Sequence, residues 1–294
     1  MTQRRVIDYE GSKYSTEFWT PTREYEDRAE RIALRAVLPP RGRRLVDIGA
    51  GAGRLAELYL GYDEIVLMDY ARSTLLEARE RWAGDARFRF VAADVYRLPF
   101  AGAAFDTVVM VRVLHHLADV PKALEQIAAT LCAGGTLVAE FANKRNLKAM
   151  LRYALRRQPW SPYSREPVEF VELNFDFHPA WMREQLRAAG LEIGQERSAS
   201  FFRVGLLKRL LGAKMLASID GALQRPLAPL AVTPSQFLKC TLRRAGAPPD
   251  AAGVFKCPAC GSTEWREAPE ALTCSNGHAW SIRDGVHDFK ARSE

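Results

Sequence analysis

Short hydrophobic runs alternate with amphipathic stretches over the first half of the chain, and this pattern is typical of a parallel α/β sheet. The runs predict strands at residues 45–48, 65–68, 88–92, 105–111 and 136–140. Helical periodicity follows Thr22 and ends at Pro39-Pro40, and a second helix is expected over 120–131. Pro121 near the start of that helix costs nothing, because the first N–H groups of a helix have no partner within it.

The second half of the chain continues this pattern with two interruptions. A helix at 181–189, a strand at 191–193 and a last, antiparallel strand at 233–240 are expected, with insertions at about 143–180 and 198–232. Residues 243–253 are rich in Ala, Pro and Gly, which indicates a linker. The expected organisation is a helical segment at 1–40, a main domain at 41–245 and a small domain at 254–294.

A glycine-rich turn follows the first expected strand. Gly49, Gly51 and Gly53 lie between that strand and a helical pattern at 54–58. Glycine accepts positive φ angles and lets a ligand approach the backbone closely. The unpaired N–H groups at a helix N-terminus attract an anionic group. The turn is therefore expected to cradle a ligand.

The spacing of these glycines distinguishes two kinds of site. A dinucleotide fingerprint places its third glycine one position later, where this chain has Arg54. The pattern Asp47-x-Gly49-x-Gly51-x-Gly53 instead resembles motif I of the class I S-adenosylmethionine-dependent methyltransferases. Asp69 after the second strand and Asp94 after the third fall in the same register. The turn Leu98-Pro99-Phe100 resembles the branch of that family that includes ubiquinone and menaquinone biosynthesis methyltransferases.

This resemblance implies a Rossmann-like α/β fold with a mostly parallel seven-stranded sheet, and S-adenosyl-L-methionine as cofactor. It assigns the methionine moiety to Asp47 and the glycines, the ribose hydroxyls to Asp69 and the adenine amino group to Asp94. The alternative for Asp69 is a helix N-cap, although Ser73 already offers an oxygen there. The implied cofactor-binding residues are Asp47, Gly49, Ala50, Gly51, Gly53, Asp69, Tyr70, Asp94, Val95 and Val111.

His115 and His116 follow the fourth strand, at the sheet edge where ligands bind in open α/β folds. A neutral imidazole there is a candidate catalytic base, which would accept a proton as the methyl group arrives. The alternative is that both side chains form a wall of the cofactor pocket. The segment before residue 40 either covers the cofactor or packs on the sheet.

Four metal-ligating residues lie in the small domain. Cys257 and Cys260 form one pair, and Cys274 and His278 form a second pair after a hairpin-length spacer. Two such pairs suit one tetrahedral structural Zn²⁺ with no open position for water, and the metal would supply folding energy to so short a segment. The module resembles the zinc domain of the tRNA-methyltransferase activator, with which it shares the tail at 282–286. Its ligand set also resembles the N-terminal module of an rRNA guanine methyltransferase.

The net charge of +7 and the pI of about 9.3 permit an acidic partner. Basic residues gather in both insertions, and Lys148, Arg152 and Arg156 recur at helical spacing with leucines expected on the opposite face. This favours contact with RNA or an anionic membrane surface, or a solvated lid helix. We expect a cytoplasmic protein, because the sequence shows neither an apolar leader nor a membrane-spanning run.

Three functions remain open from the sequence. The first is methylation of a small-molecule or lipid-like acceptor, which the Leu98-Pro99-Phe100 turn and the apolar insertions favour. The second is methylation of rRNA or tRNA, which the zinc module and the positive charge favour. The third is a non-catalytic protein that binds the cofactor and acts as a partner of other proteins.

Overall fold

The structure is a computed structural model that describes residues 6–11, 20–243 and 253–290. Part of the expected N-terminal segment and most of the expected linker lie outside these ranges. The predicted order of elements is confirmed elsewhere, with boundaries that differ by a few residues. The strand expected at 88–92 is observed as β3 (Phe88–Ala92).

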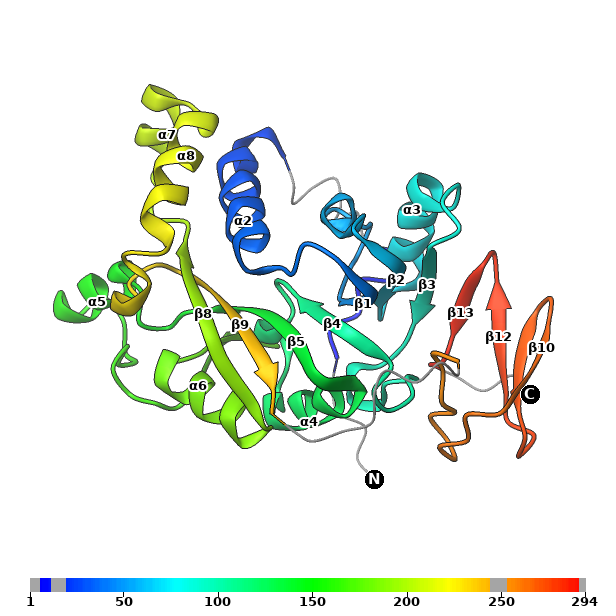
Figure 1. The fold of residues 1–294 in the computed structure, drawn as a ribbon. Coiled ribbons are helices and arrows are strands. Elements are labelled where there is room, and N and C mark those ends of the chain that lie inside the picture. Colours follow the sequence, from blue (N-terminus) through cyan, green and yellow to red (C-terminus); the bar gives the residue numbers. More distant parts are fainter. Residues whose placement is uncertain (1–5, 12–19, 244–252, 291–294) are drawn as a thin grey trace.

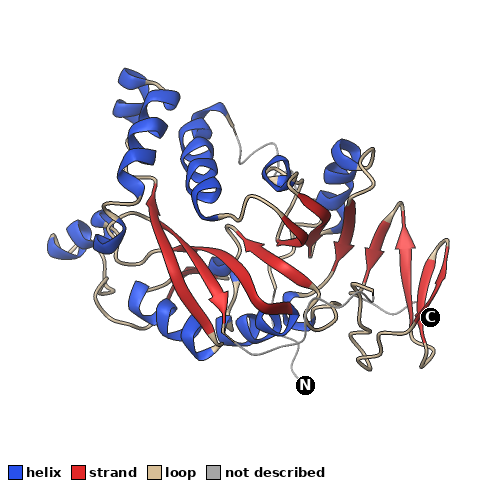
Figure 2. Ribbon diagram, viewed as in Figure 1, coloured by secondary structure: helices blue, strands red, loops and turns tan. Residues whose placement is uncertain are grey.

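A twisted sheet forms the centre of the molecule, and its strands extend across most of the molecule in Figure 2, from the helices at the left to the C-terminal unit at the right. Five neighbouring strands are parallel. In spatial order these are β3, β2 (Tyr62–Asp69), β1 (Gly42–Ile48), β4 (Phe105–Met110) and β5 (Leu131–Ala142). Next come β9 (Ser235–Leu242) and β8 (Leu191–Ala199), and β9 is antiparallel to both of its neighbours, as the sequence predicted.

Helices cover both faces of this sheet because alternate strand residues point to opposite sides. Val46 belongs to a hydrophobic cluster that includes residues of α4 (Val120–Thr130) and α6 (Pro179–Ala188). Its neighbour Leu45 belongs to a second cluster, with residues of α2 (Glu24–Val37) and α3 (Arg72–Trp82). The expected α/β architecture with two covered faces is therefore present.

The prediction of a seven-stranded sheet is wrong, because the sheet has eleven strands. The last, β13 (Val286–Asp288), pairs in parallel with β3, and the Phe289 N–H donates to the Ala92 carbonyl at 2.8 Å. Three antiparallel strands continue the sheet outward, which are β12 (Ala279–Arg283), β11 (Ala271–Cys274) and β10 (Trp265–Ala268). An uncovered β3 would leave a row of unpaired backbone groups at the sheet edge, and β13 satisfies them.

The two insertions fold at the other end of the sheet, beside β8 (Figure 1). The first contains α5 (Leu147–Ala154) and the hairpin of β6 (Val168–Val171) and β7 (Asn174–Asp176). The second contains α7 (Gly205–Leu211), α8 (Ala213–Gln224) and the short 3₁₀ turn η5 (Ala228–Leu230). Tyr25 on α2 anchors α8 by donating a hydrogen bond to Asp220 at 2.5 Å.

Within the described ranges, no helix combines the length and the hydrophobicity that crossing a bilayer requires.

Candidate functional site

The glycine turn after β1 adopts the backbone that the sequence predicted. Gly49, Gly51 and Gly53 have φ angles of +79°, +52° and +69°. A Cβ on Gly49 would lie 2.1 Å from Cγ2 of Val113, whereas a Cβ on Gly51 would meet no atom within 4 Å. The turn is therefore closely packed at Gly49 and open at Gly51.

The helix expected directly after this turn is reduced to one 3₁₀ turn, η2 (Ala56–Tyr59). The chain has no room for a longer helix, because β2 begins at Tyr62. An anionic ligand group at this turn would thus meet individual backbone N–H groups rather than the dipole of a long helix.

A cavity opens beside the glycine turn, where the strand order reverses between β1 and β4. This is the crevice in which open α/β sheets bind ligands. Its walls include all of the predicted cofactor-binding residues except Gly53 and Asp94. Sequence reasoning missed other lining residues, namely Val6, Ile7, Tyr9, Ile48, Ala52, Arg54, Leu55, Met68, Thr74, Arg81, Ala93, Arg112, Val113 and Leu117.

Two carboxylates occupy the floor of this cavity. Asp47 is 3% exposed and accepts a hydrogen bond from the Tyr59 hydroxyl at 2.9 Å, and burial raises its pKa to about 7. Asp69 accepts from the Gly51 N–H at 2.8 Å and from the Ala71 N–H at 2.9 Å. Burial raises the pKa of Asp69, and these two N–H groups oppose that shift. Each carboxylate oxygen has a second lone pair, so Asp69 can also accept hydrogen bonds from a ligand.

Asp94 does not line the cavity in this structure. Its Oδ1 accepts from the Tyr96 N–H at 2.8 Å and so caps the 3₁₀ turn η3 (Val95–Arg97). Its Oδ2 lies 3.7 Å from Nε of Arg97. The neighbouring Val95 does line the cavity, so an adenine contact of Asp94 stays a prediction from the resemblance.

Both alternatives that the sequence left open for the segment before residue 40 are observed, because α2 packs on the sheet and residues 6–9 lie at the cavity. Val6, Ile7 and Tyr9 are part of its wall. Glu10 fastens this segment to α3, because its carboxylate accepts from the N–H groups of Arg72 and Ser73 at 2.7 and 3.0 Å. A glutamate from a distant segment therefore caps α3, and the expectation that Ser73 serves as the cap is wrong.

His115 and His116 form the 3₁₀ turn η4 (Leu114–His116) at the end of β4. Nδ1 of His116 lies 3.1 Å from the Leu173 carbonyl, which can only accept, and Nε2 lies 3.2 Å from the Tyr9 hydroxyl. Burial lowers the pKa of His116, so a neutral ring donates to Leu173 and accepts from Tyr9. Burial, and then His116, hold the pKa of His115 well below its ordinary value, and its Nδ1 has no partner among the described residues.

An ion-pair network connects α2 to the cavity wall. Glu30, 1% exposed, pairs with Arg54 at 3.0 Å and with Arg112, and both arginines line the cavity. Burial would raise the pKa of Glu30, but Arg112 and Arg54 outweigh it and lower that pKa. Arg112 has a φ of +60°, rare for a residue with a side chain, and its N–H donates to Glu140. No local motif could reveal this network, because its members are far apart in the sequence.

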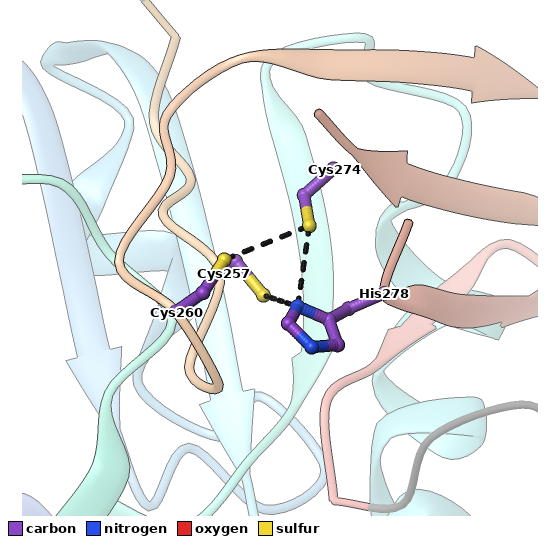
Figure 3. Close-up of side chains that lie close together, drawn as sticks. All are labelled: Cys257, Cys260, Cys274 and His278. Atoms are coloured by element: carbon purple, nitrogen blue, oxygen red, sulfur yellow. Dashed lines mark hydrogen bonds between the residues drawn. The ribbon is translucent and has the colours of Figure 1, made fainter. Parts of the chain in front are cut away.

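The second candidate site lies in the small C-terminal unit. The ligand atoms of Cys257, Cys260, Cys274 and His278 all lie within 4.8 Å of one another, and Figure 3 shows the four side chains pointing to one centre. Cys260 Sγ and Cys274 Sγ are 3.7 Å apart. Nδ1 of His278 is 3.6 Å from Cys257 Sγ and 3.5 Å from Cys274 Sγ.

These spacings test whether a metal fits. Zinc–sulfur and zinc–nitrogen bonds of about 2.3 and 2.05 Å at tetrahedral angles give S···S and S···N separations of about 3.8 and 3.6 Å. The observed distances agree with both values, so the four donors suit a tetrahedral ion. His287, which stands on β13, is not part of this cluster.

The C-terminal unit also contacts Tyr70 in the wall of the cavity and Phe100 of the main domain. Lys290 Nζ lies 5.0 Å from the ring centroid of Tyr70 and 3.9 Å from the Glu10 carboxylate. Phe255 lies 6.3 Å from Phe100, ring centroid to ring centroid, in a stacked arrangement. The two candidate sites are therefore physically connected through β13, Lys290 and Phe255.

Comparison with known proteins agrees with this geometry. Residues 46–139 match the family model described as a methyltransferase domain. The demethylmenaquinone methyltransferase of Clavibacter sepedonicus is 36% identical over 114 residues, which is 38% of this chain and 46% of that protein. The malonyl-[acyl-carrier protein] O-methyltransferase of Legionella pneumophila is 30% identical over 112 residues, 37% of this chain and 38% of that protein. The chain thus spans half or less of the length of these curated relatives.

Solved structures share the fold at low sequence identity. An S-adenosylmethionine-dependent methyltransferase of Mesorhizobium loti has a TM-score of 0.53 at 19% identity, covering 72% of this chain and 97% of that one. A chain from the complex between the Haloferax volcanii Trm112 methyltransferase activator and a candidate methyltransferase has a TM-score of 0.54 at 18% identity, covering 77% and 94%. Residues 46–139, which match the methyltransferase family model, carry the glycine turn, Asp69 and most of the residues that line the cavity.

Proposed function

We propose that this protein transfers a methyl group from S-adenosyl-L-methionine to a small-molecule or lipid-like acceptor. The observation that carries the proposal is the cavity at the β1–β4 switch point, whose walls combine the glycine turn with Asp69 inside the methyltransferase domain. The cofactor, when bound, supplies an activated methyl group on a sulfonium. In this proposal Gly51 offers open backbone, Asp69 accepts from the ribose hydroxyls, and Val95 and Val111 contact the base.

The chemistry asks mainly for alignment of the acceptor atom with the methyl group. Residues 6–9 and Leu117 would exclude water from the cavity. The ion pair with Glu30 would fix the position of the Arg112 side chain in the cavity wall. Only an acceptor that must lose a proton needs a base. Of the two histidines only His116 lines the cavity, and its lowered pKa keeps the ring neutral, so His116 is the candidate base that an acceptor could reach.

The acceptor class is argued from the relatives and from the lining. Proteins named for demethylmenaquinone, for ubiquinone and menaquinone, and for a malonyl-carrier substrate each match 37–40% of the chain. Apolar side chains such as Ile7, Leu117 and Val113 make up much of the cavity wall. Both features favour an apolar acceptor over a strongly polar one.

We further propose that Cys257, Cys260, Cys274 and His278 hold a structural Zn²⁺. Four protein ligands leave no open position, so the ion would stabilise the C-terminal unit rather than take part in methyl transfer.

Calorimetric titration with S-adenosylhomocysteine tests the cofactor assignment. We expect micromolar binding that Asp69→Ala weakens at least tenfold. Asp63→Ala is the matched control, because Asp63 is an exposed carboxylate near the start of the same strand. Absence of binding by the folded protein would reject the assignment and leave the role of a non-catalytic partner. Single-turnover transfer of labelled methyl to lipid extracts then tests the acceptor class.

A second candidate function is methylation of RNA, which the run of basic residues between 144 and 165 favours. RNA phosphate contacts give binding that weakens steeply with salt. Titration of the protein with tRNA and rRNA fragments at two salt concentrations separates this function from the first.

A further inference from the structure

Exposed hydrophobic side chains are concentrated in one part of this protein. Among the described residues, every exposed large hydrophobic side chain except Leu60 lies between 147 and 230. Scattered single residues of this kind are ordinary on protein surfaces, but a gathering of them in one region marks an interaction site. The members are Leu147, Leu151, Tyr153, Leu155, Tyr163, Phe170, Val171, Val204, Leu206, Leu210, Leu211, Met215, Ile219 and Leu230.

Helix α5 shows the arrangement most clearly. Leu147, Leu151 and Leu155 recur every four residues as one stripe, and they are 56%, 55% and 62% exposed. Lys148 and Arg152 follow them on the adjoining stripe and are exposed as well. The leucine face of α5 is thus exposed, and Ala149 is the only buried residue of this helix.

The α7–α8 insertion repeats the pattern. Leu206 and Leu210 are 64% and 70% exposed, and none of the residues of α7 is buried. The basic residues Arg209 and Lys214 stand beside them and are also exposed. Two short helices from different insertions therefore offer leucines and cations together.

Both insertions leave the sheet at the same edge and meet each other. Ser235 pairs with Ala142 at the end of β5 and with Ala199 at the end of β8, so the three chain segments are neighbours there. The Leu147 N–H donates to the Val232 carbonyl at 2.8 Å, and Arg145 donates to the Leu230 carbonyl at 3.3 Å. In Figure 1 the helices α5, α7 and α8 lie at the end of the molecule away from β10–β13.

We propose that α5, α7 and η5 form a docking surface for an anionic lipid bilayer. Leucines that enter the headgroup region would lose their contact with water, while adjacent lysines and arginines would meet lipid phosphates. Charge supports this choice, because no acidic residue occurs between Ala142 and Glu166. Aliphatic leucines dominate the surface of α5 and α7, whereas single-stranded RNA is bound by stacking on aromatic rings.

Docking at this surface places the membrane beside the carboxyl edge of the sheet, which also carries the cavity. A lipid-like acceptor could then reach the methyltransferase domain without crossing water. Membrane binding itself does not depend on the proposed methyl transfer, so either can fail without the other.

The test is flotation of the full-length protein with vesicles of phosphatidylcholine, with or without about 30% phosphatidylglycerol. We expect binding to the anionic vesicles only, and weaker binding at higher salt. The triple variant Leu147→Ser, Leu151→Ser, Leu155→Ser should bind at least about tenfold more weakly. The single variant Leu60→Ser is the control, because Leu60 is 43% exposed outside the docking surface.

A charge variant separates the two contributions. Lys148→Gln with Arg152→Gln should also reduce binding, whereas Arg266→Gln with Arg283→Gln, on the exposed C-terminal unit, removes the same charge and should not. Circular dichroism and thermal unfolding verify that each variant is folded. Equal binding by the leucine variant and wild type, or binding to RNA but not to vesicles, would overturn the proposal.

Discussion

Three glycines with positive φ allow backbone strain, steric packing and ligand binding to be measured separately. Gly134, at φ +72°, has no atom within 4 Å of a Cβ position and lies away from the cavity. Gly51 is equally open but lines the cavity, and Gly49 both lines it and touches Val113. Gly134→Ala introduces backbone strain alone. Gly51→Ala adds a side chain at the cavity, and Gly49→Ala adds an overlap with Val113 as well.

The expected magnitudes follow from the local geometry. An alanine in the left-handed region costs about 1–2 kcal/mol, so Gly134→Ala and Gly51→Ala should each lower the free energy of unfolding by that amount. At Gly49 the new Cβ would stand 2.1 Å from Cγ2 of Val113, while carbon atoms prefer about 3.5–4.0 Å. Overpacking adds about 1–3 kcal/mol, so Gly49→Ala should lose about 2–5 kcal/mol in total.

The affinity for S-adenosylhomocysteine should rank the three variants differently from their stability. We expect Gly134→Ala to bind as wild type does, and Gly51→Ala to bind at least tenfold more weakly in spite of its small effect on stability. Denaturant unfolding and calorimetric titration measure the two quantities on the same samples. If Gly51→Ala binds with wild-type affinity, the ligand does not lie against this turn; if Gly49→Ala is as stable as Gly134→Ala, the packing against Val113 is not as described.

Three further predictions concern other parts of the molecule. Chelation of the proposed Zn²⁺ should unfold the C-terminal unit and weaken S-adenosylhomocysteine binding, because Lys290 contacts Tyr70 at the cavity wall. Cys274→Ser should reproduce both effects, whereas Cys132→Ser, at a buried cysteine outside the cluster, should reproduce neither. The pKa of Asp47 is raised from 3.8 to about 7, so its contribution to stability is complete below about pH 4 and is lost as the pH rises through 7. Asp47→Asn should therefore remove most of the fall in unfolding free energy between pH 4 and 7, an effect of a few kcal/mol. Chemical denaturation at several pH values measures this fall, and an unchanged slope would contradict the raised pKa. Tyr9→Phe removes the hydrogen bond to His116, so it should lower the free energy of unfolding by about 0.5–1.5 kcal/mol. It should also speed hydrogen exchange in the segment over the cavity. The control Tyr163→Phe, at an exposed tyrosine, should change neither quantity.

Local patterns carried much of what could be predicted about the fold. The strands of the parallel core, the antiparallel last strand and the positive φ angles of Gly49, Gly51 and Gly53 follow from hydrophobic runs and residue type. The spacing of Cys257, Cys260, Cys274 and His278 likewise predicted one cluster, because two-ligand knuckles bring their side chains together locally.

Contacts between distant segments could not be predicted in this way. Glu10 caps α3, Glu30 pairs with Arg112, and the N-terminal segment forms a wall of the cavity. Each depends on two residues that meet only when the chain has folded, and neither partner carries a local signal of the other. Most of the residues expected to bind the cofactor line the cavity, whereas the lining residues contributed by the N-terminal segment were not predicted.

The sequence by itself determined the class of fold, the place of the glycine turn and the identity of the four clustered Cys and His residues, because these depend on the periodicity and chemistry of neighbouring residues. Only the tertiary structure decided that β13 joins the sheet at β3, that Asp94 caps η3, and that the leucines of α5 face outward. Strand edges and helix faces have no preferred partner until the surrounding elements are packed. The free energy of that packing, rather than local propensity, selects among the partners that the sequence allows.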